Sequence, residues 1–227
     1  MAVFSSSAYA ATLQIDFSSD AGTQVGWEGL GGTADGTPKS GAFSGYTDLA
    51  AGNITVTVAG TGLFNRGHNN STGAGSDFVG TDLDALYADI LARNTAGGTI
   101  NLTIAGLAVG TYQITTHHLI NTPSPGTFAL DVQDADSASF SQSIGTFTQG
   151  TGVSGASGSF NPNVITFDVV SNGTDPVLVR MTQVTASSGG NTGGWYGFNG
   201  MEIAVPEPSS AVLFGLGTLG FLLRRRR

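Results

Sequence analysis

The chain of 227 residues and 23.0 kDa has the size of one ordinary domain. Its 35 glycines would weaken long helices, and its 40% hydrophobic residues with a mean hydropathy of +0.11 exclude general disorder. The net charge of −8 argues against a nucleic-acid partner, and the lack of cysteine excludes disulfides, thiolate nucleophiles and cysteine-bound metals.

The N-terminus carries the end of an export signal. Ala8, Tyr9 and Ala10 form the small-x-small pattern that signal peptidase cuts, which predicts Ala11 as the first residue of the mature chain. The preceding residues lack the basic and apolar parts of a complete signal, so we interpret residues 1–10 as a residual signal peptide. A frayed, serine-rich tail is the alternative.

Period-two alternation of apolar and polar residues predicts eight or nine short strands in the body, residues 11–205. Turn sequences rich in glycine, proline and asparagine separate these strands, as at 121–126 and 171–176. We therefore predict an all-β fold, a jelly-roll-like β-sandwich. The predicted strands are 12–18, 53–58, 99–104, 111–120, 127–132, 139–147, 164–170, 177–184 and 198–205.

One segment follows a helical period instead. Residues 81–84 have the pattern of a capping box, acidic residues stand near the start, and Arg93 stands near the end. We predict one short helix over residues 81–93 that caps an open end of the sandwich. Its apolar positions are Leu83, Leu86, Tyr87, Ile90 and Leu91.

His117 and His118 are neighbours in a predicted strand, so their side chains face opposite sides of the sheet and cannot share one metal ion. His118 falls on the face of Tyr112 and Ile114, which predicts a position in the core or at the sheet edge. His117 falls on the other face, where we expect a structural role and keep ligand binding as the alternative.

Three closely spaced carboxylates, Asp131, Asp134 and Asp136, stand at the end of a predicted strand. Hard oxygen ligands at this spacing suit calcium, so a structural calcium ion is the cofactor that the sequence suggests. A solvated acidic turn is the alternative, because the pattern lacks the glycine and the final glutamate of an EF-hand loop.

Aromatic residues in polar, glycine-rich surroundings are the candidate ligand-binding groups: Trp27, Trp195 and Tyr196. Sugar C–H faces stack on exposed rings while polar side chains bind the hydroxyls. The alternative is that the tryptophans hold the sandwich together. We predict no catalytic residue, because nucleophile motifs are absent and a glycosidase pair would depend on aspartates or on Glu28 and Glu202.

The C-terminus has three parts in order. Pro206, Glu207 and Pro208 precede an uncharged apolar stretch, 209–223, and four arginines end the chain. As a helix the stretch would span about 22 Å, short of the about 30 Å of a hydrocarbon core, so we predict a weak transmembrane anchor. The terminal residues that would hold it on the cytoplasmic side are Arg224, Arg225, Arg226 and Arg227.

These residues, 206–227, resemble the PEP-CTERM sorting signal of Gram-negative bacteria. The resemblance implies that the membrane transpeptidase exosortase recognises the chain and cuts it near the Pro-Glu-Pro motif. It also implies a precursor held transiently in the inner membrane, then a mature protein at the cell surface or in the extracellular matrix. The family is associated with bacteria that make extracellular polysaccharide and biofilm.

Residues 106–112 and 197–203 resemble segments of the galactose-binding-like and malectin-like β-sandwiches that are common in PEP-CTERM proteins. This resemblance spans about residues 77–203 and hints at sugar. We therefore expect a non-catalytic, exported protein with affinity for carbohydrate and extracellular polysaccharide as its partner. The alternative is a secreted hydrolase that acts on polysaccharide.

Overall fold

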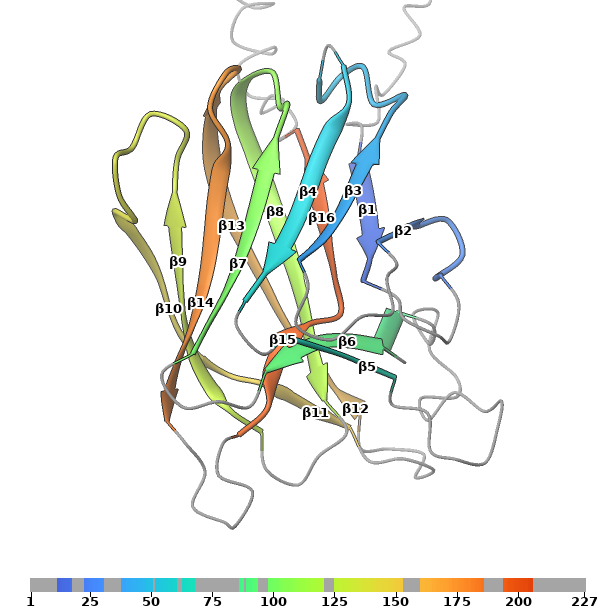
Figure 1. The fold of residues 1–227 in the computed structure, drawn as a ribbon, viewed down its shortest axis with the longest axis vertical. Helices are drawn as coiled ribbons and strands as arrows, with labels where there is room; N and C mark the ends of the chain where they lie inside the picture. The colour runs from blue at the N-terminus through green and yellow to red at the C-terminus, as the bar shows by residue number, and fades with distance from the viewer. Residues whose placement is uncertain are drawn as a thin grey trace, which may run out of the picture.

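The computed structural model describes residues 12–17, 23–30, 38–50, 52–60, 63–67, 86–87, 89–93, 98–120, 125–152, 160–185 and 194–205. Two sheets face each other, and a smaller third sheet lies across one end (Figure 1). The predicted all-β sandwich is confirmed. All nine predicted strands are present, with ends that differ from the prediction by at most three residues.

The first sheet contains β1 (Thr12–Asp16), β2 (Glu28–Gly29), β8 (Val109–Ile120), β11 (Gly150–Gly152), β12 (Phe160–Asn161), β13 (Asn163–Asn172) and β16 (Gly200–Ala204). The long strand β8 lies at its centre, between β13 and β16, and β1 and β2 follow β16. At the end of β8, β11 pairs in parallel with Leu119 and Ile120, the last two residues of that strand, and β12 pairs with β11.

The second sheet is antiparallel throughout, in the order β10-β9-β14-β7-β4-β3. Its strands are β3 (Lys39–Phe43), β4 (Ile54–Ala59), β7 (Thr99–Ala105), β9 (Thr127–Gln133), β10 (Gln142–Thr148) and β14 (Val177–Thr185). β3 was not among the predicted strands. Its sequence, Lys-Ser-Gly-Ala-Phe, has few apolar residues to alternate, and it forms an edge strand beside β4.

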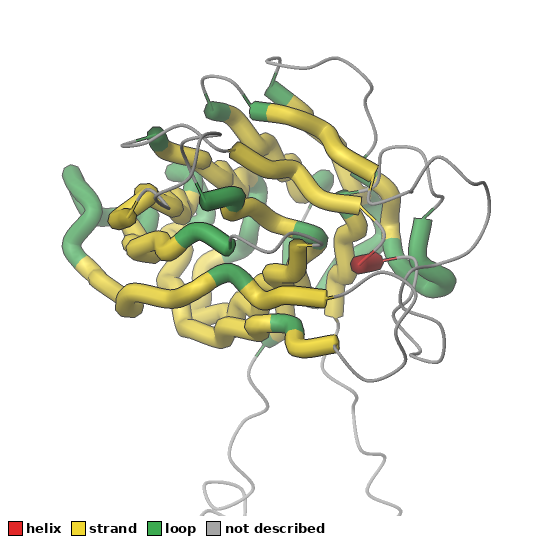
Figure 2. Tube along the Cα trace, turned by 90° about the horizontal axis from the view of Figure 1, so that it is seen from below, coloured by secondary structure: helices red, strands yellow, loops and turns green. Residues whose placement is uncertain are grey.

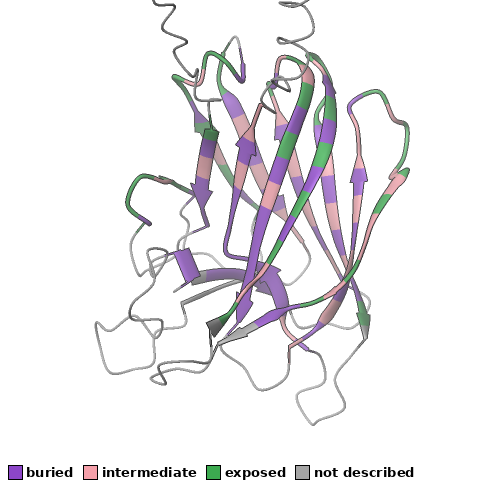
Figure 3. Cartoon of the chain, turned by 180° about the vertical axis from the view of Figure 1, so that it is seen from behind, coloured by how far each residue is buried: buried purple, intermediate pink, exposed green. Residues whose placement is uncertain are grey.

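The core lies between the two sheets because their strands alternate as predicted. In β7 every second side chain is buried, and β13 shows the same alternation of buried and exposed residues in Figure 3. The inward side chains of both sheets form one continuous hydrophobic cluster. Each large apolar side chain buried in it stabilises the fold by about 1.5–3 kcal/mol.

The predicted helix over residues 81–93 is wrong. Among the described residues of this range, only Leu86 and Tyr87 have a helical backbone, seen as the single short red segment in Figure 2. Residues 89–93 instead form β6 (Asp89–Arg93), which pairs with β5 (Phe64–Gly67) and with β15 (Tyr196–Phe198) in the third sheet. Residues 81–85 and 88 lie outside the described residues.

The reason for the error is that β6 is buried on both faces. Leu91 packs into the main core, whereas Ile90 and Ala92 pack on the opposite side with Ile120 and Trp195. A strand buried on both faces gives a continuous apolar run, which periodicity cannot distinguish from a buried helix segment. This sheet, and not a helix, covers the lower end of the sandwich in Figure 1.

The chain enters and leaves the sandwich at the opposite end. β1 and β16 are antiparallel neighbours, and Thr12 pairs with Ala204 at the upper end in Figure 1. Within the described residues, no helix is long and apolar enough to cross a membrane. The predicted signal peptide, 1–10, and the predicted transmembrane segment, 209–223, lie outside these residues.

Candidate functional site

His117 lies at the centre of a buried polar chain on the outer face of the first sheet, the face turned away from the main core. Its Nε2 donates to Glu202 Oε1 at 2.9 Å, and its Nδ1 accepts from the Tyr87 hydroxyl at 2.8 Å. Glu202 also accepts from Gln14 Nε2 at 3.0 Å. The carboxylate requires a proton on Nε2, which leaves Nδ1 free to accept from tyrosine. In the neutral form of the imidazole, these two partners specify the tautomer that carries its proton on Nε2.

Within this series of hydrogen-bonded side chains, the electrostatics favour a charged Glu202 and a neutral Tyr87. The hydrogen bond from His117 holds the pKa of Glu202 below its usual value. Burial, reinforced by the nearby charge of Glu202, raises the pKa of Tyr87. The Tyr87 and His117 side chains are both buried, so neither presents a reactive atom to a substrate. The hydrogen bonds of His117 to Tyr87 and Glu202 orient these side chains.

Trp27 covers this polar chain. Its ring lies edge-on to His117, with 5.5 Å between the ring centroids, and it packs with Leu86, Tyr87 and Leu119. Gly200 makes the approach possible, because a Cβ atom there would lie 3.1 Å from Trp27 Cζ3 and 2.6 Å from a backbone oxygen. Two predicted ligand-binding residues, Trp27 and His117, are therefore brought together, but in a packed layer.

Glu28 and Glu202 cannot form the carboxylate pair of a glycosidase. Glu202 pairs with Gln14, on the outer face, whereas Glu28 pairs with Ile15, whose side chain is in the core. Because paired residues share a face and neighbours alternate, the two glutamates lie on opposite faces of the sheet with β1 between them. Glu28 instead accepts from the Tyr46 hydroxyl at 2.9 Å.

His118 lies inside the main core, one of the two positions predicted for it. Its Nδ1 donates to the carbonyl oxygen of Gly197 at 2.8 Å, and its Nε2 accepts from the Thr116 hydroxyl at 2.8 Å. The centroids of the Phe128 and Phe198 rings lie 5.0 and 5.2 Å from the centroid of the imidazole. Complete burial lowers the pKa of His118 to about 3. His118 is therefore a neutral, structural residue.

The other aromatic candidates lie in or beside β15 of the third sheet. The Tyr196 side chain is fully buried, and its hydroxyl donates to the Gly98 carbonyl oxygen at 2.8 Å. Trp195 is half-buried against Ile90, Ala92 and Ile120. The Tyr196 side chain is therefore out of reach of a ligand at the surface. Trp195 forms a backbone β-bridge with Pro125, one of the residues that line the pocket described below.

The three aspartates predicted to bind calcium are engaged by different protein groups. Asp131 forms an ion pair with Arg180 at 3.1 Å, whereas Asp134 accepts from the backbone N–H of Val170 at 2.7 Å. Asp136 accepts from the Asn172 side chain at 2.7 Å. In the part of the chain that the structure describes, no group of three metal-binding side chains could hold an ion. Asp134 and Asp136 thus fasten the turn after β9 to β13, whereas Asp131 joins β9 to β14.

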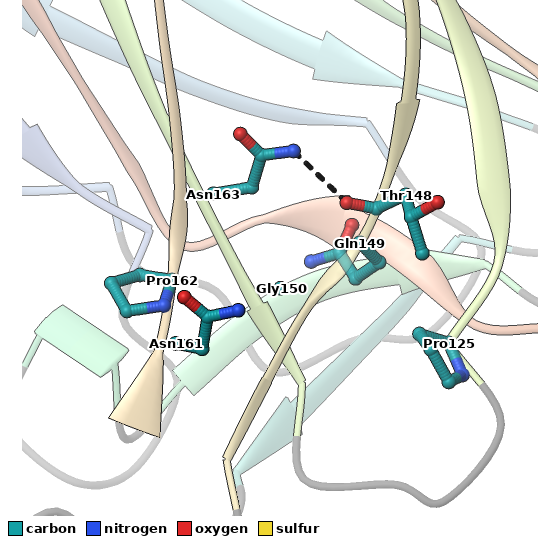
Figure 4. A pocket seen from close by; sticks show the side chains of 7 residues that line it. All are labelled: Pro125, Thr148, Gln149, Gly150, Asn161, Pro162 and Asn163. Carbon is teal, nitrogen blue, oxygen red and sulfur yellow. Dashed lines mark hydrogen bonds between the residues drawn. The ribbon is translucent and has the colours of Figure 1, made fainter. Parts of the chain in front are cut away.

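A pocket of about 340 Å³ opens at the lower end of the sandwich, where β10 runs into β11 and β12 runs into β13. This volume lies at the small end of the range for small-molecule sites. None of the lining side chains is charged, and amide groups supply most of the polar atoms (Figure 4). The lining residues are Pro125, Thr148, Gln149, Gly150, Asn161, Pro162 and Asn163.

Gln149 is the unusual member of the pocket. Its side chain is 2% exposed, and its Oε1 accepts from the backbone N–H of Gly197 at 3.1 Å. The Nε2 atom has no hydrogen-bond partner. Turning the amide round would set two N–H groups against each other, so the bond to Gly197 determines which way the free donor points. Figure 4 shows this nitrogen directed into the pocket, toward Asn161.

The sequence offered little signal for this site. Glycine and threonine around Gln149 have the composition of a surface loop, and Asn161-Pro162-Asn163 has that of an ordinary turn. The two segments meet because Gly150 allows a close approach: a Cβ atom there would lie 2.5 Å from Asn163 N and 2.7 Å from Asn161 O. Such a contact between distant strands cannot be read from local composition.

Comparison with known proteins identifies the C-terminus. Residues 204–227 match the PEP-CTERM protein-sorting motif, which confirms the predicted sorting signal and indicates that the chain is exported. The motif residues Pro206, Glu207 and Pro208 and the four terminal arginines lie outside the described residues. No curated protein matches the chain.

Solved structures similar to the body include two carbohydrate-binding modules and one enzyme. The family 35 module from Clostridium thermocellum is 13% identical, with 72% of this chain and 96% of that chain covered and a TM-score of 0.36. The CBM35 from Cellvibrio japonicus Abf62 is 15% identical, with coverages of 62% and 82% and a TM-score of 0.35. Bacteroides uniformis β-glucuronidase is 12% identical, with a TM-score of 0.48; the match covers 85% of this chain but 17% of the enzyme.

Proposed function

We propose that the chain is a cell-surface or extracellular-matrix protein that exosortase processes, and that its body binds carbohydrate without catalysis. The sorting motif at residues 204–227 carries this proposal. The chain would divide into a residual signal peptide, 1–10, the sandwich, 11–205, and the sorting signal, 206–227. Exosortase and, transiently, the inner membrane of a Gram-negative bacterium would be its partners during export.

The position of the motif supports a role for the body outside the membrane. The motif begins at Ala204, the last residue of β16, at the end of the sandwich where the chain leaves it. Ala204 pairs with Gln113 of β8, and the pocket residue Gly150 pairs with Leu119 of the same strand. Six residues of a strand span about 20 Å, so the pocket lies far from the tail. An anchored precursor would present the pocket away from the membrane.

Removal of the C-terminal tail is the expected result of processing. Proline lacks a backbone donor and disfavours helix before it, so Pro206 and Pro208 should keep the motif extended and open to cleavage. In a host with exosortase, intact mass spectrometry of surface protein should give a mass that ends close to Glu207. Replacing both prolines by alanine should leave uncut precursor in the inner membrane.

Replacing residues 224–227 by serine should impair orientation and retention instead, which separates recognition of the motif from anchoring. Surface protein that still contains Arg227 would contradict processing and make the tail a permanent anchor.

Carbohydrate binding without turnover is the expected behaviour of the body. The pocket offers uncharged donors and acceptors, which suit hydroxyl groups, and the glutamates of the alternative hydrolase lie on opposite faces of a sheet. A glycan array should therefore detect binding, and the same protein should release no reducing sugar from the bound polysaccharide. Reducing-sugar release that Glu28→Gln or Glu202→Gln abolishes would contradict the non-catalytic role and favour the hydrolase.

A further inference from the structure

Gln149 Nε2 is a buried amide donor that has no hydrogen-bond partner among the described residues. Gln149 is fixed in place by two hydrogen bonds: its backbone N–H donates to Gly126 O at 2.9 Å, and its Oε1 accepts from Gly197 N at 3.1 Å. Only 2% of the residue is exposed. A buried donor without a partner is costly, and few such donors persist in folded proteins. The Nε2–H group is therefore preorganised toward whatever enters the pocket.

The chemistry of the lining restricts the class of ligand. An anion would need lysine or arginine and a cation would need carboxylates, and the pocket has neither. Amide and hydroxyl side chains match groups that both donate and accept hydrogen bonds. The rings of Pro125 and Pro162 stand on opposite sides in Figure 4 and supply apolar surface for C–H groups. Neutral sugars combine these two properties.

The neighbouring amide is arranged to accept as well. Asn163 Nδ2 donates to the Thr148 carbonyl oxygen at 3.0 Å, the bond drawn in Figure 4. This bond uses the nitrogen of the amide and leaves Oδ1 as an acceptor. Gln149 and Asn163 thus offer one donor and one acceptor at the same opening, a pairing that suits a hydroxyl group.

We propose that this pocket binds one neutral sugar unit, with Gln149 Nε2 donating to one of its oxygen atoms. The assignment rests on the proposed carbohydrate binding of the body and adds the position of the site and the class of sugar. It differs from the aromatic site that the sequence predicted at Trp27, Trp195 and Tyr196, because those rings pack in or against hydrophobic clusters.

The test uses the purified full-length chain and neutral disaccharides built from glucose, galactose or mannose, with glucuronic acid and glucosamine as charged probes. Binding is measured by calorimetry, and the side-chain amide signals of Gln149 are followed by NMR. We expect at least one neutral sugar to bind and to shift these signals. The Gln149→Glu variant keeps the acceptor for Gly197 N–H but loses the donor, so its affinity at neutral pH should fall at least about tenfold.

Two further variants control the result. Gln113→Glu makes the same chemical change at an exposed site on β8 and should bind as the wild type does. Asn161→Ala removes an exposed amide from the pocket and should weaken binding severalfold with the fold intact, which keeps the test valid if Gln149→Glu fails to fold.

The outcomes separate the two proposals. Binding that survives both pocket variants would overturn this site while leaving carbohydrate binding in place. A preference for glucuronic acid or glucosamine over the neutral sugars would overturn the class of ligand. Failure of every sugar to bind would remove the proposed carbohydrate binding itself, and this inference with it.

Discussion

An alanine at position 197 is expected to destabilise the folded protein by about 3 kcal/mol or more. Gly197 of β15 pairs with Ala92 of β6, and a Cβ atom there would lie 2.7 Å from Ala92 Cα and also contact the Leu91 carbonyl oxygen. Both are backbone atoms, so the two strands would have to separate. Separation would also break the buried hydrogen bonds of Gly197 with His118 and Gln149.

Urea denaturation of the wild type and the Gly197→Ala variant measures this loss. Gly52→Ala is the matched control, because a Cβ atom at that exposed glycine meets nothing within 4 Å. Its stability should change by no more than about 1 kcal/mol, since alanine mainly restricts the unfolded chain. Equal stability of the two variants would contradict the close packing of β15 on β6.

Local alternation was sufficient to predict the strands that line the main core. In β4, β7 and β9 each second residue is apolar and buried, so pattern and environment agree at every position. The same rule placed His118 on the face of Tyr112 and Ile114, and the structure buries it in the core. Where one face of a strand is buried and the other is solvent-exposed, the alternation in the sequence predicts both the strand and the face on which each side chain lies.

The pattern failed where a segment is enclosed on both faces or where the site depends on contacts between distant strands. Leu91 and its neighbours in β6 are apolar on both faces, which imitates a helix. Gln149 is polar and buried, and its hydrogen bonds go to Gly197 and Gly126, neither of which is near it in sequence. The local sequence shows which residue types are neighbours along the chain, but it does not show which distant backbone segments will bury a given side chain.

The sorting motif illustrates the opposite case. Its residues are recognised in order along the chain, so the predicted tail could be identified without any tertiary contact, and the family match begins where β16 ends. The proposed sugar pocket depends on three separated segments, which are Pro125 ahead of β9, the β10–β11 junction and the β12–β13 junction. Export could therefore be inferred from sequence, whereas the ligand site required the fold.

Acid should destabilise the protein well before its carboxylates are protonated, and His118 should be the cause. Burial lowers the pKa of His118 from 6.5 to about 3 in the folded state. The unfolded chain binds a proton at this histidine below its ordinary pKa, whereas the folded chain does not until far lower pH. Stability is therefore lost as pH falls below 6.5, by about 1.4 kcal/mol per pH unit once well below it.

Glu202 affects the free energy of unfolding in a different pH range. The hydrogen bond from His117 lowers the pKa of Glu202 from 4.5, so the stability that this carboxylate adds is present above that pH and is lost as pH falls through the lower folded value. Chemical denaturation between pH 6.5 and 4.5 consequently measures the effect of His118 apart from that of Glu202, and it should amount to about 2 kcal/mol or more over that range.

Substitutions distinguish the effect of His118 on acid stability from that of its neighbour His117. His118→Asn can still donate to the Gly197 carbonyl oxygen, but it cannot titrate, so it should be less stable at pH 7 and lose little further stability by pH 4.5. His117→Gln should retain most of the wild-type slope. If the asparagine variant does not fold, NMR of the wild type gives the same information, because the His118 ring signals should not titrate between pH 8 and 5. A slope that disappears with His117→Gln and persists with His118→Asn would show that the outer-face histidine, and not the core histidine, makes the fold sensitive to acid.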